Sequence, residues 1–311
     1  MNTISIVLPA YKRSYLKESI QSLLAQTYRD FELIVVDDCS PENLVSVVDE
    51  FQDPRISYHR SEVNIGGTNL VAAWNLAMKY AHGEWCVLAS DDDVYHVQYL
   101  ERMVALVAKY PHCDLVHSRI ATINGSGEVT SVCHGRIEYE SATQFIYARV
   151  MLGEMLTAQE YMFRIAALKK IGGFVSFARA WFSDEATWFL LSRNGVACSS
   201  MVLFYWRISG ENITSRKDDI PEKITAAEAY LHWAKQSVPN LLSQNSEEDK
   251  YLYRVLLANM QSRNEGVIRT LVIKLPLVKR IFLICSNRFS LHMRIRFVYD
   301  LLRCNLDSRN A

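Results

Sequence analysis

The sequence predicts an α/β protein in which a doubly wound, mostly parallel sheet is followed by a helical C-terminal extension. Strand and helix patterns alternate along residues 4–109, and from Pro221 onward only helical patterns remain. Two apolar strands, expected at 31–36 and 85–89, each run directly into acidic residues. Because ligands bind at the carboxyl ends of strands in open α/β sheets, these acids mark the first candidate site.

Each predicted strand of the first half is a short apolar run bounded by proline, glycine or aspartate. The helices between them carry apolar residues at helical spacing, as do Leu16, Ile20 and Leu23. Alternation of this kind predicts parallel strands joined by right-handed crossovers. We expect strands at 4–8, where Pro9 stops the run, 31–36, 55–59 and 85–89, and helices at 15–26, 42–51 and 68–81.

The second half departs from strict alternation. The turn Asn-Gly-Ser-Gly at 124–127 separates two short runs and predicts a hairpin of 121–123 with 129–132. We divide the chain into a main α/β domain over 1–215 and a helical extension over 216–311. Further helices are expected at 97–109, 142–152, 163–171 and 184–193, and further strands at 114–117 and 196–207.

The 311 residues are 50% hydrophobic and 22% charged, a composition that can bury a large core. The formal net charge is zero, so no nucleic-acid partner is indicated. The seven cysteines are scattered without a C-x-x-C pair, which argues against a zinc site or a disulfide framework and favours a reducing cytoplasm. We expect neither a leader peptide nor a membrane-spanning helix.

Three adjacent acids, Asp91, Asp92 and Asp93, follow the strand that ends near Ala89. Their mutual repulsion calls for a positive partner, and the natural candidate is a hard divalent cation that also bridges phosphate groups. A solvated acidic turn is the simpler interpretation of one such run, but a second acidic pair at 37–38 favours a site. We expect Asp93 itself to be solvated or to cap a helix.

Short motifs occur in a fixed order along residues 7–92, and a later group follows. The later group comprises Gly-Gly-Phe at 172–174, Ser-Asp-Glu at 183–185 and Trp188. The earlier motifs are VLPAY at 7–11, VVDDCS at 35–40, NIGG at 64–67, GEW at 83–85 and SDD at 90–92. Over roughly residues 3–210 the chain resembles the family 2 glycosyltransferases, whose GT-A fold is a Rossmann-like sheet.

This resemblance implies inverting transfer of a sugar from a nucleotide-diphosphate donor, with a UDP-sugar expected and Mg²⁺ or Mn²⁺ as cofactor. It implies that Asp38 recognises the base, that Asp92 with Asp91 holds the metal, and that Asp184 deprotonates the acceptor hydroxyl. The residues for which it implies nucleotide contacts are Pro9, Ala10, Tyr11, Asp38, Gly66, Gly67 and Asp91.

The chain departs from the family pattern at three positions. Ala89 stands where the metal motif often has aspartate, Cys39 follows the first acidic pair, and Ser183 stands where glutamate often precedes the base. No Gln-x-x-Arg-Trp motif, the mark of processive synthases, is present. We therefore expect an enzyme that adds one sugar at a time.

Other functions fit part of the pattern. A magnesium-dependent nucleotidyltransferase would share the nucleotide-binding half, but Lys12 and Arg13 follow the first strand without the usual glycines. A non-catalytic nucleotide-sugar-binding protein is favoured only by Ala89. A receiver domain would place its acidic pair after the first strand rather than the second, and it would leave Asp184 without a role.

The segment from about residue 269 is basic and amphipathic, with Asp300 as the single acid between Arg269 and Arg303. Such helices bind anionic membrane surfaces. That location would suit a saccharide or lipid-linked acceptor in the assembly of bacterial surface polysaccharides such as O-antigen or capsule, with the protein in the cytoplasm at the inner face of the membrane. Packing of these helices on the catalytic domain or on a second subunit is the alternative. The basic residues are Arg269, Lys274, Lys279, Arg280, Arg288, Arg294, Arg296 and Arg303.

Five further residues have two interpretations each. Arg207 ends the last apolar strand and either pairs with the diphosphate or lies on the surface. Glu160 is a weak candidate for contact with the acceptor. His117 is expected to be a packed histidine, and Trp85 and Trp188 are expected to belong to the core rather than to a sugar platform.

Overall fold

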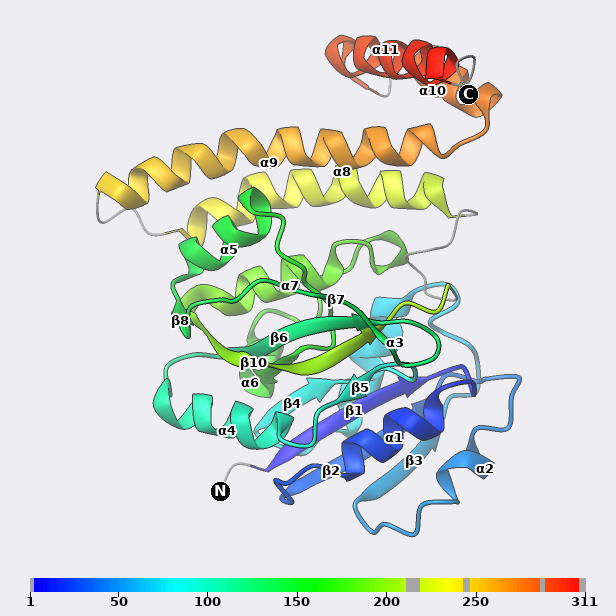
Figure 1. The fold of residues 1–311 in the computed structure, drawn as a ribbon, viewed down its shortest axis with the longest axis vertical. Coiled ribbons are helices and arrows are strands. Elements are labelled where there is room, and N and C mark those ends of the chain that lie inside the picture. Colours follow the sequence, from blue (N-terminus) through cyan, green and yellow to red (C-terminus); the bar gives the residue numbers. More distant parts are fainter. Residues whose placement is uncertain (1–2, 211–218, 243–246, 286–288, 308–311) are drawn as a thin grey trace.

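The computed structural model describes residues 3–210, 219–242, 247–285 and 289–307 (Figure 1). Its centre is a single mixed sheet, ordered β3-β2-β1-β4-β9-β6-β10-β5, with β7 beside β6 and β8 beside β10. The strands are β1 (Ile4–Ala10), β2 (Phe31–Asp37), β3 (Ile56–Arg60), β4 (Trp85–Leu88), β5 (Val94–Tyr95), β6 (Leu115–Ile123), β7 (Val129–Val132), β8 (Tyr139–Glu140), β9 (Tyr161–Arg164) and β10 (Val196–Arg207).

The first half of the sheet is parallel and contains the predicted strands. β1 pairs with β2 on one side and β4 on the other, and β2 pairs with β3. β9 is antiparallel to both β4 and β6, whereas β6 and β10 are parallel to each other. The carboxyl ends of β1, β2 and β4 therefore meet at one edge, as the doubly wound pattern predicts.

Helices cover both faces of this sheet. α1 (Leu16–Leu24), α2 (Val45–Val48) and α4 (Tyr99–Lys109) pack on one face. The other face carries α3, α5, α6, α7 and, beyond them, α8. The bounds of the remaining helices are α3 (Leu70–Ala77), α5 (Ala142–Met151), α6 (Ile165–Lys170), α7 (Ser183–Leu191), α8 (Ile220–Ser237), α9 (Glu247–Ile273), α10 (Leu277–Cys285) and α11 (Leu291–Asp307).

β1 shows how the sequence pattern produces this double covering. Ile6 and Leu8 point into the core beneath α1 and α4, and Val7 points into the opposite core beneath α3. All three side chains are fully buried, as expected where consecutive residues face opposite sides of a covered sheet.

The C-terminal helices stack on the face that carries α7. In Figure 1, α8 and α9 lie above α5 and α7, and α10 and α11 lie at the end of the molecule furthest from β3. Tyr230 of α8 and Leu256 of α9 belong to the same hydrophobic core as the sheet. The division near residue 215 stays a prediction. In the described part of the chain, no helix has the length and apolar character needed to cross a membrane.

Most of the predicted elements are confirmed, and four differ. The strands predicted at 114–117 and 121–123 form the single strand β6. β1 continues through Pro9 to Ala10, because beyond Val7 only β2 pairs with it and the missing N–H leaves no partner unsatisfied. The helix predicted at 163–171 begins only at Ile165, after β9. The helix predicted at 42–51 is reduced to α2.

Candidate active site

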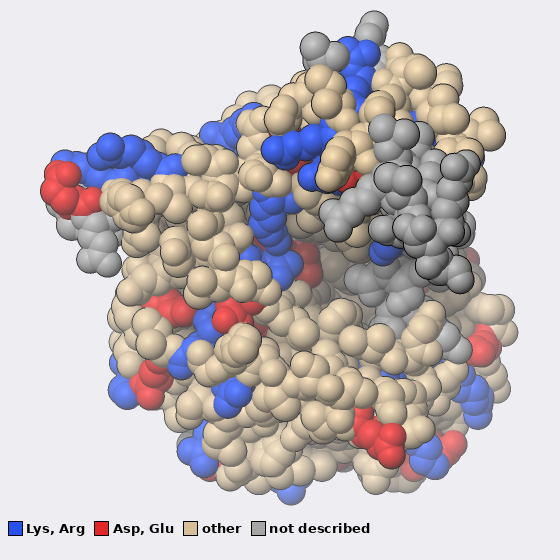
Figure 2. Space-filling model, turned by 45° about the horizontal axis from the view of Figure 1, so that its top comes forward, with Lys and Arg blue, Asp and Glu red and all other residues tan. Residues whose placement is uncertain are grey.

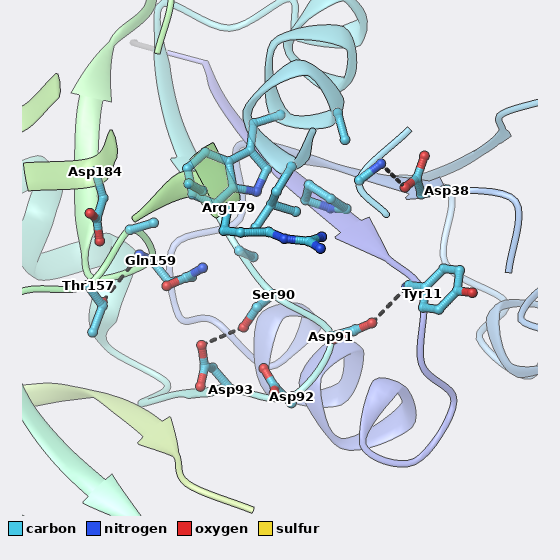
Figure 3. A pocket seen from close by; sticks show the side chains of 18 of the residues that line it. Tyr11, Asp38, Ser90, Asp91, Asp92, Asp93, Thr157, Gln159, Arg179 and Asp184 are labelled. Atoms are coloured by element: carbon cyan, nitrogen blue, oxygen red, sulfur yellow. Dashed lines mark hydrogen bonds between the residues drawn. The ribbon is translucent and has the colours of Figure 1, made fainter. Parts of the chain in front are cut away.

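A cavity of about 410 Å³ opens at the carboxyl edge of β1, β2 and β4 (Figure 3). In the view of Figure 3, Tyr11 and Asp38 lie on one side, and Asp184, Thr157 and Gln159 lie on the other. All the predicted site residues line this cavity, namely Pro9, Ala10, Tyr11, Asp38, Gly66, Gly67, Asp91, Asp92 and Asp184. The structure therefore brings together residues from both halves of the motif pattern.

Asp38 holds the glycine loop in place. Its Oδ1 accepts a hydrogen bond from the backbone N–H of Ile65 at 2.9 Å, and its Oδ2 accepts one from Gly66 at 2.6 Å. A Cβ atom on Gly66 would lie 2.8 Å from the same Oδ2. Only glycine allows this close approach without a shift of the carboxylate or the loop.

Asp91 connects two strand ends. Its Oδ2 accepts hydrogen bonds from the backbone N–H groups of Tyr11 and Lys12, both at 2.7 Å. The loop after β4 is thus fastened to the loop after β1. This contact fixes the backbone of Pro9, Ala10 and Tyr11 along the wall of the cavity.

The acidic loop, which carries Asp91, Asp92 and Asp93, concentrates negative charge. Burial makes the ionised form of these carboxyl groups unfavourable. Burial, together with the neighbouring Asp92, raises the pKa of Asp91 to about 6. Burial also raises the pKa of Asp92, although Lys12 acts in the opposite direction. Such a cluster favours binding of a cation.

The structure contradicts the expected exposure of Asp93. Its side chain is buried, Ser90 donates its hydroxyl hydrogen to Oδ2 at 2.5 Å, and the backbone N–H of Arg207 donates to Oδ1 at 2.9 Å. Asp93 is therefore an internal support of the loop, because β10 passes directly behind it.

Arg207 is also internal and is not a surface residue. It is 1% exposed, its Nε donates to the backbone oxygen of Asp92 at 2.7 Å, and it forms an ion pair with Glu18 at 2.7 Å. These contacts place the guanidinium under the acidic loop. Arg207 is absent from the cavity lining, so the structure gives no support to a diphosphate contact.

Asp184 approaches the cavity from α7. The helix begins at Ser183, and the preceding residue, Phe182, adopts a left-handed backbone with φ of 68°. Asp184 is therefore the second helical residue and not the N-cap, although its Oδ1 accepts the N–H of Glu185 at 2.8 Å. Burial raises the pKa of Asp184 to about 6.

The sequence did not reveal Arg179, which extends across the cavity toward Tyr11 and Asp38 (Figure 3). Its Nη1 donates to the backbone oxygen of Gly67 at 3.1 Å, so it bridges the loop before α7 and the glycine loop. Its φ is 55°, and that of Ala180 is 54°, conformations that cost non-glycine residues free energy. Its location between the Gly-Gly-Phe and Ser-Asp-Glu motifs is the one signal in the sequence.

Thr157 and Gln159 were also missed, because they lie in a loop without a motif. Glu160 supports this loop from inside and does not face the cavity. It is 1% exposed, and its Oε2 accepts hydrogen bonds from the N–H and the hydroxyl of Thr157, both at 3.2 Å. The weak assignment of Glu160 to acceptor contact is therefore wrong.

The aromatic residues and His117 have the expected packing roles. Trp85 and Trp188 are buried, and the indole N–H of Trp188 donates to the backbone oxygen of Thr157 at 3.0 Å. His117 is buried and stacks on Tyr161. Burial lowers its pKa to about 3, so it is neutral at ordinary pH.

The described residues contain no group of three histidine, cysteine or acidic side chains placed to hold a metal. Asp91 and Asp92 nevertheless fit a Mg²⁺ or Mn²⁺ site of the kind in which substrate phosphates and water complete the coordination. The donor set is all oxygen, and its charge repulsion is relieved by a cation. The two residues thus form the candidate metal site.

The doubly wound sheet, with acidic loops and a facing carboxylate at its carboxyl edge, defines a GT-A-type α/β protein. The family model described as "Glycosyl transferase family 2" matches residues 5–170. That match covers more than half of the chain, and the chain belongs to this family.

The curated relatives include two bacterial glycosyltransferases with named substrates. The chain is 26% identical over 223 residues to the poly(ribitol-phosphate) beta-N-acetylglucosaminyltransferase TarS of Staphylococcus aureus, which covers 64% of this chain and 37% of TarS. It is 36% identical over 107 residues to WfgD of Escherichia coli, a UDP-Glc:alpha-D-GlcNAc-diphosphoundecaprenol beta-1,3-glucosyltransferase, which covers 34% of this chain and 41% of WfgD. The chain thus spans less than half the length of these relatives.

Solved structures share the fold. Residues 1–349 of TarS in complex with UDP-GlcNAc superpose with a TM-score of 0.65 at 21% identity, covering 89% of this chain and 77% of that one. The mannosyltransferase PcManGT of Pyrobaculum calidifontis, in complex with GDP-Man and Mn²⁺, gives a TM-score of 0.58 at 15% identity, covering 97% of this chain and 80% of that one. At these identities the likeness concerns the fold.

Proposed function

We propose that this chain is an inverting glycosyltransferase, which moves a sugar from a nucleotide-diphosphate sugar to a hydroxyl group of an acceptor. The observation that carries the proposal is one cavity lined by two sets of residues. Asp38, Gly66 and Asp91 line one side, and Asp184 faces them from α7. A donor held by the first set presents its sugar toward the carboxylate of the second.

The donor half is proposed to bind a UDP-sugar. Asp38 lies beside the glycine loop, and its carboxylate can accept the ring N–H of a pyrimidine next to Tyr11. Because Gly66 has no side chain, the nucleotide can lie directly against the backbone beside Asp38. TarS and WfgD support this donor class, since the one is described in complex with UDP-GlcNAc and the other as using UDP-Glc.

Asp92 and Asp91 are proposed to hold Mg²⁺ or Mn²⁺ at the diphosphate. When bound, the metal neutralises the charge that develops on the leaving nucleoside diphosphate. PcManGT, which was solved with Mn²⁺, supports this assignment. Arg179 adds a cation beside the glycine loop, where a guanidinium can donate two hydrogen bonds to phosphate oxygens.

Asp184 is proposed to act as the base. Its carboxylate takes the proton from the acceptor hydroxyl while that oxygen attacks the sugar carbon opposite the leaving diphosphate, which inverts the configuration. Because its pKa is about 6, the carboxylate is mostly ionised at neutral pH and still has useful proton affinity. The acceptor approaches past Thr157 and Gln159.

The acceptor is proposed to be a saccharide, free or lipid-linked, in surface-polysaccharide assembly at the inner face of the membrane. WfgD, which is described with a diphosphoundecaprenol acceptor, supports the lipid-linked class. Val278 and Phe282 of α10 are 79% and 73% exposed beside Lys279 and Arg280. Figure 2 shows Lys and Arg residues over this upper part of the molecule.

Some of the basic residues form ion pairs within the C-terminal extension. Arg269 pairs with Asp300 at 2.6 Å, and Arg296 lies 3.6 Å from Glu265. These pairs join α9 to α11, so these two arginines are paired within the extension, and packing on the catalytic domain or on a second subunit stays the alternative. Arg288 lies outside the described residues, as does the side chain of Arg303.

One assay separates this function from the alternatives. The protein is incubated with Mn²⁺ and a panel of UDP-, GDP- and dTDP-sugars, with and without saccharide acceptors, and the release of nucleoside diphosphate is measured. A glycosyltransferase releases it faster with acceptor. In a parallel reaction with a nucleoside triphosphate and a sugar phosphate, a nucleotidyltransferase instead releases pyrophosphate, and a binding protein releases neither product.

A further inference from the structure

Glu185, the residue after Asp184, is buried among three partners from three helices. It is 1% exposed, and its carboxylate accepts hydrogen bonds from Arg149 of α5 at 2.5 Å and from Tyr230 of α8 at 2.5 Å. Arg263 of α9 donates to both of its oxygens, at 2.8 and 3.0 Å. Two of the three partners therefore belong to the C-terminal extension, outside residues 5–170 that match the family model.

The same two residues of the extension also hold Phe182, which lies two positions before Asp184. The ring of Phe182 stacks on that of Tyr230, with centroids 4.5 Å apart and planes inclined by 18°. The guanidinium carbon of Arg263 lies 5.8 Å from the centre of the Phe182 ring. Because Phe182 also has a left-handed backbone, these contacts stabilise a turn that is costly for a non-glycine residue.

From this geometry we propose that Arg263 and Tyr230 are positioning residues, which hold Glu185 and Phe182 and thereby fix Asp184 toward the cavity. The proposal rests on the proposed function only for the task of Asp184 as the base. It makes α8 and α9 part of the catalytic apparatus rather than an appendage. A lone aspartate at the start of a short helix would otherwise be free to change rotamer.

The charged groups around Asp184 and Glu185 determine in which direction each substitution shifts the pKa of Asp184. Arg149 faces both carboxylates, and Tyr230 and Arg263 face that of Glu185, whereas Arg193, two residues beyond the end of α7, is exposed. Burial alone would raise the pKa of Glu185, but Arg149 and Arg263 lower it to about 2, so it stays ionised. Loss of the Glu185 charge should therefore lower the pKa of Asp184, and loss of the Arg263 charge should raise it.

The test is a titration of Asp184 in the full chain, without any substrate. Protein labelled with ¹³C at aspartate carboxyl groups is titrated by NMR, and the Asp184 signal is assigned by its loss in Asp184→Asn. We expect Glu185→Gln and Arg263→Gln to move the midpoint in opposite directions, each by on the order of one pH unit. Arg254→Gln, an exposed arginine of the same helix, is the matched control and should leave the midpoint unchanged.

Rescue by a conservative change separates positioning from a general loss of structure. Arg263→Lys should restore most of the wild-type midpoint, and Tyr230→Phe should shift it in the same direction as Arg263→Gln but less. If Arg263→Gln does not fold, Tyr230→Phe and Arg263→Lys still test the proposal. Midpoints equal to wild type in these variants, or shifts of Glu185→Gln and Arg263→Gln in the same direction, would overturn it.

Turnover of the donor identified in the panel then reports on catalysis separately. Arg263→Gln should lower kcat at least tenfold while KM for the donor changes less than threefold, because the nucleotide contacts lie across the cavity. If the NMR midpoints shift as expected but the wild type turns over no donor, the positioning role stands and the proposed function fails. If the wild type turns over donor but the midpoints of the variants are unshifted, the proposed function stands and the positioning role fails.

Discussion

The Nε atom of Arg207 donates a hydrogen bond to the backbone oxygen of Asp92 across 2.7 Å, although 115 positions of the sequence separate the two residues. The backbone N–H of Arg207 donates to Asp93 in the same place, at 2.9 Å. A buried cation thus lies directly beneath the loop that carries the candidate metal ligands Asp91 and Asp92. The loop keeps its shape because β10 holds it from behind.

Replacing Arg207 with methionine should destabilise the fold. The change removes a buried cation and leaves the backbone oxygen of Asp92 without this donor, which typically costs about 3 kcal/mol. The free energy of unfolding, measured by urea denaturation, should fall by that amount. Arg193→Met, at an exposed position, is the control and should have little effect. Equal stability of the two variants would show that Arg207 does not support the loop.

Asp92→Asn should weaken binding of UDP in the presence of Mn²⁺. The substitution removes one anionic ligand, and we expect an affinity loss on the order of tenfold, or about 1.4 kcal/mol. In excess EDTA the variant and the wild type should bind UDP alike. Isothermal titration calorimetry measures the UDP affinity with Mn²⁺ and in excess EDTA. The control is Asp49→Asn, at an exposed position at the end of α2. Wild-type turnover that persists undiminished in excess EDTA would contradict the metal assignment.

Gly66→Ala should weaken UDP binding even without metal. The added Cβ would lie 2.8 Å from Asp38 Oδ2 and 3.4 Å from Leu70, so the carboxylate or the loop must move. We expect at least a tenfold loss of affinity in EDTA, or about 1.4 kcal/mol. Gly135→Ala is the matched control, because nothing lies within 4 Å of a Cβ there. If both variants bind like the wild type, the glycine loop does not contact the nucleotide.

The exposed face of α10 should bind anionic liposomes at low salt. Val278 and Phe282 can insert among lipid headgroups while each neighbouring basic residue adds about 1 kcal/mol. In flotation with vesicles of phosphatidylglycerol, the full chain should rise, and the double variant Val278→Ser and Phe282→Ser should not. Val63→Ser with Val129→Ser alters two exposed valines elsewhere, and this variant should float. A wild-type chain that stays at the bottom would leave these helices with a packing role.

The parts of the site that could be predicted from the sequence are those encoded by neighbouring residues. The parallel strands β1, β2 and β4 are apolar runs, and their acidic ends follow within a few positions. β9 overlaps the start of the helix predicted at 163–171, because the short apolar runs on either side of Arg164 fit a strand and a helix alike. Its partners, β4 and β6, are distant in sequence.

Contacts between distant segments explain the remaining differences. From the sequence alone, Asp93 is expected to be exposed, and Arg207 is expected to be a cation at the end of a strand. Both are buried because β10 lies behind the acidic loop and places Arg207 in contact with Asp92 and Asp93. Arg179 contacts the glycine loop from a left-handed backbone conformation, and no residue type in its segment predicts that conformation. The partners of Glu185 come from three helices, and no pattern in the sequence predicts that these helices meet.

Asp184→Asn tests the central claim most directly. Asparagine preserves the size and the acceptor of the hydrogen bond from Glu185, so the melting temperature and UDP affinity should match the wild type. Because the base must be ionised, wild-type turnover should fall as the pH drops through about 6. At neutral pH, Asp184→Asn should turn over donor and acceptor between about 10² and 10⁴ times more slowly. A folded variant that turns over within a few-fold of the wild-type rate would contradict the account, because Asp184 would then not be the base.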